Sequence, residues 1–137
     1  MNSLIVMTKA FKETSIKTDL IQSSGIMERI SREIRQAYGV NTISASDLKL
    51  NTKDENGNNK TVRFLLSGTN IEFFENDILT GNLNTPNIEV TAVSFTEITS
   101  AQSKAIKISF SVQSIKDSAD RVVDFYDTIV LRGDYSN

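Results

Sequence analysis

The hydrophobic period of the chain changes at Gly39, and this change most constrains the fold. Before Gly39, apolar residues recur at the three- and four-residue spacings of a helix; after it, they alternate with polar residues at the two-residue spacing of a strand. The three- and four-residue spacings place apolar residues on one face of a helix, and the two-residue spacing places them on one face of a strand. We therefore expect an α+β domain in which one long helix packs across an antiparallel β-sheet.

The predicted helix spans residues 4–38. Its apolar seam, counted in sevens from Glu13, has one polar interruption and consists of Ile16, Leu20, Ser23, Met27, Ile30, Ile34 and Ala37. Gly39 fits a left-handed cap at the C-terminal end. At ~1.5 Å per residue the helix would be on the order of 50 Å long, longer than a compact domain of this size. Its N-terminal third should therefore project beyond the domain.

Two ion pairs are expected on the exposed face of this helix. Glu28 precedes Arg32 by four residues, and Arg29 precedes Glu33 by the same spacing. Because both arginines are predicted to face solvent, charge changes at Arg29 or Arg32 should leave the fold intact.

The antiparallel sheet region is predicted at residues 47–132, within a single domain of residues 1–137. The apolar positions that alternate with polar ones are Leu48, Leu50, Val62, Phe64, Leu66, Ile71, Phe73, Ile88, Val90, Ile106, Ile108, Phe110, Val112, Val123, Phe125, Ile129 and Leu131. In the strand that begins at Ile88 the phase reverses at Val93, which predicts a bulge near Ala92.

The composition narrows the functions that the chain can perform. It contains no histidine and no cysteine, so the commonest general base and the commonest zinc ligands are absent. With 15 basic and 17 acidic residues the formal charge is −2, and no basic stretch suited to nucleic acid occurs. No stretch reaches the ~18 apolar residues of a membrane span. We expect no enzymatic activity, no cofactor or metal, and neither nucleic acid nor a small-molecule substrate as a partner.

One short motif imitates a calcium-binding loop. Asp54, Asn56 and Asn58 place oxygen ligands on alternate residues, as an EF-hand does. The glycine is misplaced at Gly57, and Leu65 stands where a bidentate glutamate belongs. A hairpin turn is therefore the favoured interpretation, with a calcium site as the alternative.

Four other carboxylates are candidates for catalysis or metal binding. Asp117 and Asp120 are better explained by a solvated loop than by a metal site. Glu97 and Asp127 interrupt runs of apolar residues, and a pair of carboxylates could hydrolyse a glycoside. For Asp127 we favour a charge that keeps an edge strand from pairing.

The order of these features resembles the minor pilins and pseudopilins of type IV pilus and type II secretion systems, most closely the J-type minor pseudopilins. In that family a helix ending in an R-x-I/L-R-x-A pattern precedes the sheet, and Arg32 to Ala37 (REIRQA) match this pattern. The terminal strand of the family ends in Leu-Arg, matched here by Leu131 and Arg132. The resemblance implies a non-catalytic, pilin-like structural subunit that acts by assembling into a filament.

The resemblance also implies where such a subunit binds its neighbours. Family members begin with a leader peptide, a cleavage site and an apolar membrane span, and the apolar start of this chain would be the end of such a span. The residues expected to contact neighbouring subunits are Leu4, Ile5, Val6, Met7 and Phe11. The implied partners are other pilin or pseudopilin subunits and, through the missing N-terminal segment, the membrane. The domain would lie outside the cytoplasm, in the cell envelope.

Two other interpretations stay open. The apolar run from Leu4 to Met7 could fold back onto the sheet as an ordinary hydrophobic N-terminus. The chain could instead be a stand-alone structural or binding module, such as a phage or adhesin component, that forms a soluble oligomer. A cleavage signal and a membrane span upstream in the gene would favour the pilin interpretation, and their absence would favour the module.

Overall fold

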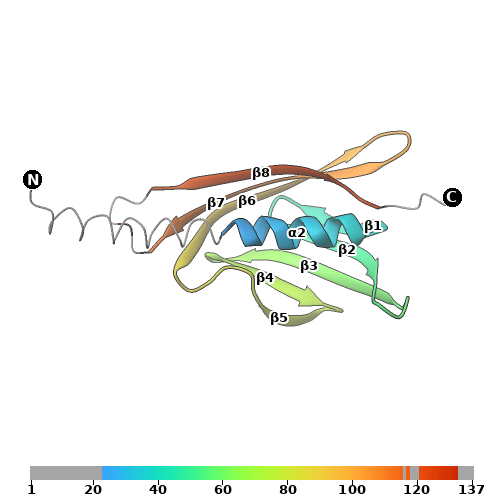
Figure 1. Ribbon diagram of the computed structural model, residues 1–137, viewed down its shortest axis with the longest axis horizontal. Coiled ribbons are helices and arrows are strands. Elements are labelled where there is room, and N and C mark those ends of the chain that lie inside the picture. The colour runs from blue at the N-terminus through green and yellow to red at the C-terminus, as the bar shows by residue number, and fades with distance from the viewer. Residues whose placement is uncertain (1–22, 116, 118–120, 133–137) are drawn as a thin grey trace, which may run out of the picture.

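The computed structural model describes residues 23–115, 117 and 121–132 (Figure 1). This described part contains one helix and eight strands, which form two antiparallel sheets. The elements are α2 Ser24–Gln36, β1 Gly39–Ser44, β2 Asp47–Lys53, β3 Asn59–Ser67, β4 Asn70–Glu75, β5 Ile78–Asn82, β6 Ile88–Thr99, β7 Lys104–Ser114 and β8 Val123–Val130.

Helix α2 lies within the predicted helical seam. Ile26, Ile30 and Ile34 recur at four-residue spacing, and all three side chains are buried on one face of the helix. The predicted ion pair between Arg29 and Glu33 forms, with 3.1 Å between Nε and Oε2, but Glu33 is buried and not on the exposed face as predicted. The helix is thus held by the burial of one apolar face and by a side-chain pair beside it.

The helix ends earlier than the sequence predicted. Ala37 has an extended backbone (φ −76°, ψ 144°), and the N–H of Tyr38 donates to the carbonyl of Asn51 at 2.9 Å. Gly39 is the first residue of β1, so its predicted role as a helix cap was wrong. With 13 residues α2 is about 20 Å long.

The first sheet joins five strands in the order β1-β2-β3-β4-β5. The predicted meander corresponds to β2, β3 and β4, in which Leu48 lies opposite Phe64 and Leu50 opposite Val62. All four side chains are fully buried, as the alternation predicted. Strands β1 and β5, at the two edges of this sheet, were not predicted.

The second sheet joins three strands in the order β6-β7-β8. The register between β6 and β7 shifts between Val90 and Ala92, which confirms the predicted bulge. Because of this extra residue, Val93 and Phe95 are buried along with Ile88 and Val90, although they have the opposite parity in the sequence.

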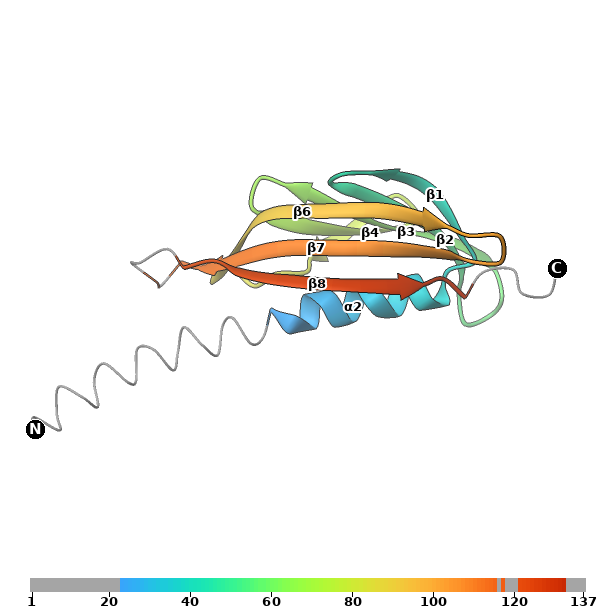
Figure 2. The ribbon, with the colours of Figure 1, turned by 90° about the horizontal axis from the view of Figure 1, so that it is seen from above.

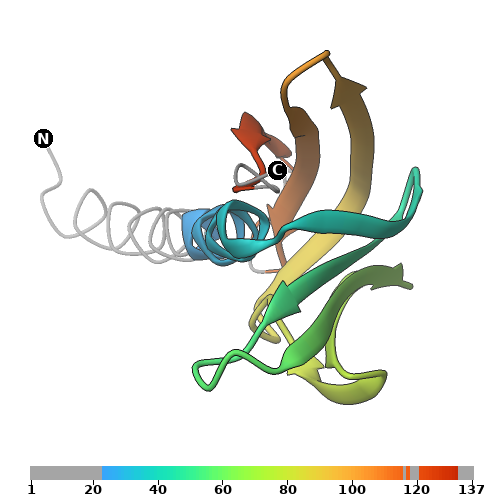
Figure 3. The ribbon, with the colours of Figure 1, turned by 90° about the vertical axis from the view of Figure 1, so that its right-hand side faces the viewer.

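The two sheets meet at an angle, and α2 lies between them. Figure 3 shows the helix in the space that the sheets enclose, and Figure 2 shows it running alongside β8 along the long axis of the molecule. Helix α2 contacts β8 of one sheet and β2 of the other, while β6 contacts β1, β3 and β4. One continuous core results, whose largest fully buried side chains include Phe64, Phe110, Ile30, Ile34, Leu48 and Ile106.

The predicted α+β architecture, with a long helix packed across one sheet, was wrong. Strands make up 60% of the described part, they form two sheets, and the single helix is short. The backbone leaves the helical conformation at Ala37, and the loop of residues 83–87 starts a second sheet with β6 instead of extending the first. Most of the predicted helix, residues 4–22, lies outside the described residues.

The side chain of Asn84 connects the two sheets. Its Oδ1 accepts a hydrogen bond from the N–H of Ile71 (3.0 Å), and its Nδ2 donates to the carbonyl of Ile88 (2.8 Å). The same Nδ2 lies 3.0 Å from Oδ1 of Asn70 and 3.3 Å from the carbonyl of Thr69. One buried amide therefore joins the β3–β4 turn and the start of β4 to the first residue of β6.

Replacing Asn84 with Ala should lower the free energy of unfolding by about 2–4 kcal/mol, because the buried N–H of Ile71 and the carbonyl of Ile88 lose their partner. Urea denaturation measures this loss. Asn82→Ala, at an exposed position nearby, is the matched control and should change stability by less than about 0.5 kcal/mol. Equal effects of the two substitutions would contradict the role assigned to Asn84.

Ser31 is a second buried polar residue, on α2 itself. It is 2% exposed, and its Oγ has no hydrogen-bond partner within the described residues. A buried hydroxyl without a partner lowers stability, because its hydrogen bonds to water in the unfolded chain are not replaced.

Ser31→Ala should therefore raise the free energy of unfolding by about 0.5–1.5 kcal/mol, since alanine removes the buried hydroxyl and favours the helix. Ser24→Ala, exposed on the same helix, supplies the effect of helix propensity alone. Thermal unfolding of both variants makes the comparison. A loss of stability in Ser31→Ala would mean that a buried water bonds the hydroxyl.

Candidate functional site

The interaction site predicted from the sequence lies outside the described residues. Its members are Leu4, Ile5, Val6, Met7 and Phe11. The site stays a prediction, and so does the alternative in which these residues fold back onto the sheet. The structure instead describes the helix that follows them in the chain and the surfaces around that helix.

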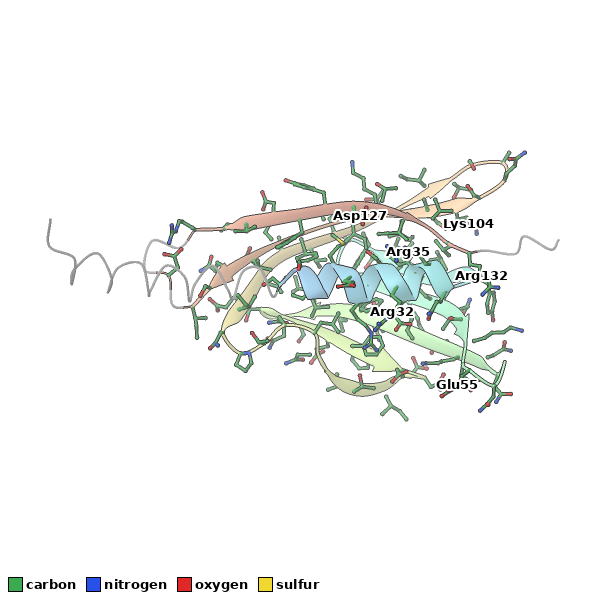
Figure 4. All side chains as sticks on the ribbon, viewed as in Figure 1. Arg32, Arg35, Glu55, Lys104, Asp127 and Arg132 are labelled. Atoms are coloured by element: carbon green, nitrogen blue, oxygen red, sulfur yellow. The ribbon has the colours of Figure 1, made fainter. Side chains whose placement is uncertain are left out.

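The exposed face of α2 is polar and charged. We call it the helix outer face, which consists of Ser24, Gly25, Glu28, Arg32, Arg35 and Gln36. Arg32 and Arg35, labelled in Figure 4, form no ion pair with any described carboxylate. Arg35 lies in the last helical turn, where a positive charge interacts favourably with the helix dipole. Neither arginine is thus tied to a carboxylate of the described fold.

Arg29 differs from these two arginines. Its guanidinium carbon lies 4.6 Å from the centre of the Phe73 ring, and its Nε bonds to Glu33. Arg29 therefore packs α2 against β4, and a charge change there should disturb the fold, contrary to the sequence-based expectation. Glu28 and Arg32, which were predicted to pair, do not form an ion pair.

Further positive side chains lie near the C-terminal end of α2. Arg132 follows β8, and the N–H of Leu131 before it donates to the carbonyl of Lys104 at 2.9 Å. Figure 4 places Arg35, Lys104 and Arg132 toward the same end of the molecule. Nζ of Lys104 is 4.0 Å from a carboxylate oxygen of Glu97, a contact too long and too exposed to neutralise it strongly.

The two candidate catalytic carboxylates, Glu97 and Asp127, lie on different strands. Asp127 is exposed on β8, the edge strand of the second sheet, and accepts a hydrogen bond from the N–H of Thr128 (2.8 Å). Glu97 lies on β6. Because β7 runs between these strands, two strand spacings of ~4.8 Å separate their backbones. The edge-strand interpretation of Asp127 agrees with its position.

The calcium-like motif forms a hairpin turn between β2 and β3, as the favoured interpretation predicted. Oδ1 of Asp54 accepts hydrogen bonds from the N–H groups of Asn56 and Asn58, both at 2.9 Å. Gly57 supplies the positive φ (81°) that the turn requires. These bonds, chiefly the one from Asn58, lower the pKa of the Asp54 carboxyl below its usual value.

In the acidic loop after β7, the described carboxylate also forms local contacts. Asp117 is buried, and its Oδ2 accepts a hydrogen bond from Nε of Arg121 at 2.7 Å, while Asp120 lies outside the described residues. Within residues 23–115, 117 and 121–132, no group of three or more acidic side chains is arranged to hold a metal ion.

Sequence reasoning missed one exposed apolar site. On β5, Ile78 is 69% exposed and Leu79 is 51% exposed. The two residues before them, Asn76 and Asp77, have positive φ angles of 52° and 66° and form the turn that joins β4 to β5. The signal that could have revealed this hairpin was Glu75-Asn76-Asp77, a polar stretch with an asparagine and an aspartate between Phe73-Phe74 and Ile78-Leu79.

The lowered pKa of Asp54 predicts a pH dependence of stability. A carboxyl whose pKa is lower in the folded state stabilises the fold above its unfolded pKa of ~3.9, and this contribution is lost as the pH falls through the folded pKa. Asp54→Ala should therefore destabilise the protein near neutral pH more than in acid. Urea denaturation across this pH range measures it, with exposed Glu55→Gln as the control. An equal cost of Asp54→Ala at both pH values would contradict the prediction.

No helix in the described part of the chain is long and apolar enough to cross a membrane. Comparison of the chain with models of protein families, with curated proteins and with solved structures gives no match.

Proposed function

We propose that the protein is a non-catalytic structural subunit of a filament of the type IV pilus or type II secretion kind. It acts by assembling with other pilin or pseudopilin subunits in the cell envelope, outside the cytoplasm, and an N-terminal segment of the kind that the resemblance implies would attach it to the membrane. The motif from Arg32 to Ala37 at the C-terminal end of α2 and the terminal Leu131-Arg132 after β8 are the sequence features behind this proposal.

The arrangement of α2 is the observation that carries it. One face of the helix, with Ile26, Ile30 and Ile34, is buried against both sheets, whereas the helix outer face remains exposed along the whole element. Arg32 and Arg35 on that face have no carboxylate partner among the described residues. A helix that is buried in the core of its own domain on one face and exposes charged side chains on the other is suited to packing between subunits.

The local contacts of the acidic residues support a structural role as well. The carboxylates of Asp54 and Asp117 are held by hydrogen bonds within turns. Carboxylates bonded to the backbone and to a neighbouring arginine stabilise the loops in which they lie.

Arg32→Glu combined with Arg35→Glu should weaken assembly and leave the fold intact, because both side chains are exposed. The double variant should unfold within a few degrees of the wild type. Its recovery with other filament subunits from detergent extracts of the envelope should fall at least about tenfold, since like charges across an interface oppose binding.

Lys107→Glu is the matched control, an exposed charge reversal on the second sheet, away from α2. It should assemble like the wild type. Assembly of the double arginine variant at the wild-type level would exclude the helix outer face from the interface. A wild-type chain recovered only as a soluble homo-oligomer would instead identify a stand-alone module.

A further inference from the structure

Asn56 is the only asparagine in the sequence that precedes a glycine, Gly57. The pair lies in the turn between β2 and β3, and both residues are exposed. A Cβ placed on Gly57 would meet no atom within 4 Å, so the space beside the turn is open to water. The side-chain amide of Asn56 forms no hydrogen bond with any described residue, and it is therefore free to react.

An asparagine followed by a glycine can modify its own chain. When the N–H of Gly57 loses its proton, the nitrogen can attack Cγ of Asn56, which closes a five-membered succinimide ring and expels the side-chain nitrogen as ammonia. Water then opens the ring. Addition of water at Cγ gives aspartate, and addition at the main-chain carbonyl gives isoaspartate. Glycine favours the attack because it has no Cβ to obstruct the approach of its nitrogen.

Two other asparagines in turns and loops are protected from this reaction by their side-chain contacts. Oδ1 of Asn76 accepts a hydrogen bond from a backbone N–H of β3 at 3.0 Å. Asn84 is held through both Oδ1 and Nδ2. The residues that follow them, Asp77 and Thr85, carry side chains that obstruct the attack. Asn56 thus combines an unbound side chain with a glycine after it.

The turn holds the attacking nitrogen in place. The N–H of Gly57 donates to the carbonyl of Asp54 at 3.0 Å, as in a type I turn with aspartate first and glycine last. The carboxylate of Asp54 accepts from the N–H groups of Asn56 and Asn58, both at 2.9 Å. While these bonds last, the N–H of Gly57 is directed at Asp54 and shielded from bases in the solvent. The reaction therefore requires the turn to open locally.

We propose that Asn56 is the site at which the chain modifies itself, and that Asp54 limits the rate by holding the turn closed. The reaction consumes water, releases ammonia and requires no enzyme. Isoaspartate lengthens the main chain by one atom and would disrupt the bond from Gly57 to Asp54, so the modified β2–β3 hairpin should be looser and more negative. This inference does not depend on the proposed filament, because it rests on the turn alone.

The test incubates the full chain in mildly alkaline buffer, folded and unfolded in urea. Peptide mapping by mass spectrometry detects the exchange of ammonia for water, and enzymatic methylation of isoaspartate identifies the product. Modification of the folded chain should appear at Asn56 before any other described asparagine, and more slowly than in urea. Asp54→Ala should accelerate it at least about fivefold in the folded chain, because two hydrogen bonds of the turn are lost. In urea the variant and the wild type should react at the same rate.

Glu55→Gln is the matched control, because Glu55, labelled in Figure 4, is an exposed carboxylate of the same turn that forms no ion pair with a described residue. It removes the same charge as Asp54→Ala and should leave the rate unchanged. Asn56→Gln, which would have to close a six-membered ring, should abolish the product.

Four outcomes would each overturn the proposal. They are modification that begins at another described asparagine, a folded chain that stays unmodified at Asn56, equal rates for the folded and the unfolded wild type, and no acceleration by Asp54→Ala. The comparison of folded and unfolded wild type decides the question even if Asp54→Ala fails to fold. Because no measurement involves another subunit, failure leaves the filament test unaffected.

Discussion

The structure depends on the burial of one apolar face of α2 between two sheets. The inner faces of the sheets, with Phe64 on one and Phe110 on the other, meet at an angle that leaves a space between them. Ile30 and Ile34, neither of which is exposed to solvent, occupy this space. Burial of apolar surface stabilises the fold by ~25 cal/mol per Å² removed from water. Filling this space with apolar side chains is therefore the largest contribution that the helix can make to stability. The same burial decides which side of α2 stays exposed to solvent.

Directional polar contacts then determine how the sheets are placed around the helix. The amide of Asn84 connects the start of β4 to the start of β6, and the N–H of Phe95 connects β6 to the carbonyl of Ala45 between β1 and β2. Apolar burial has no direction, so it cannot set the angle between two sheets by itself. Hydrogen bonds at defined backbone positions can. The fold thus combines an apolar core, which sets no direction, with hydrogen bonds that connect the two sheets at defined positions.

Much of the secondary structure could be predicted from the sequence. The alternation of Leu48 with Leu50 and of Ile106 with Ile108 identified buried strands, and the phase reversal at Val93 identified the bulge. The architecture could not be predicted, because the buried contacts of Asn84 that start a second sheet leave no periodic signal. Strand β5 was missed since its exposed residues do not alternate in polarity. The predicted interface from Leu4 to Phe11 lies outside the described residues. The exposure of Arg32 was predicted correctly, whereas the packing of Arg29 on Phe73 depends on a tertiary contact that leaves no local signal.

The parallel course of α2 and β8 along the long axis has a mechanical consequence (Figure 2). Eight residue pairs join β8 to β7, and their ladder hydrogen bonds lie perpendicular to the strands. A pull directed along the helix axis would load this ladder in shear, so that many hydrogen bonds must yield together. A pull across the strands would instead open the same ladder one bond at a time. The domain should therefore resist tension most strongly along the direction in which its helix points.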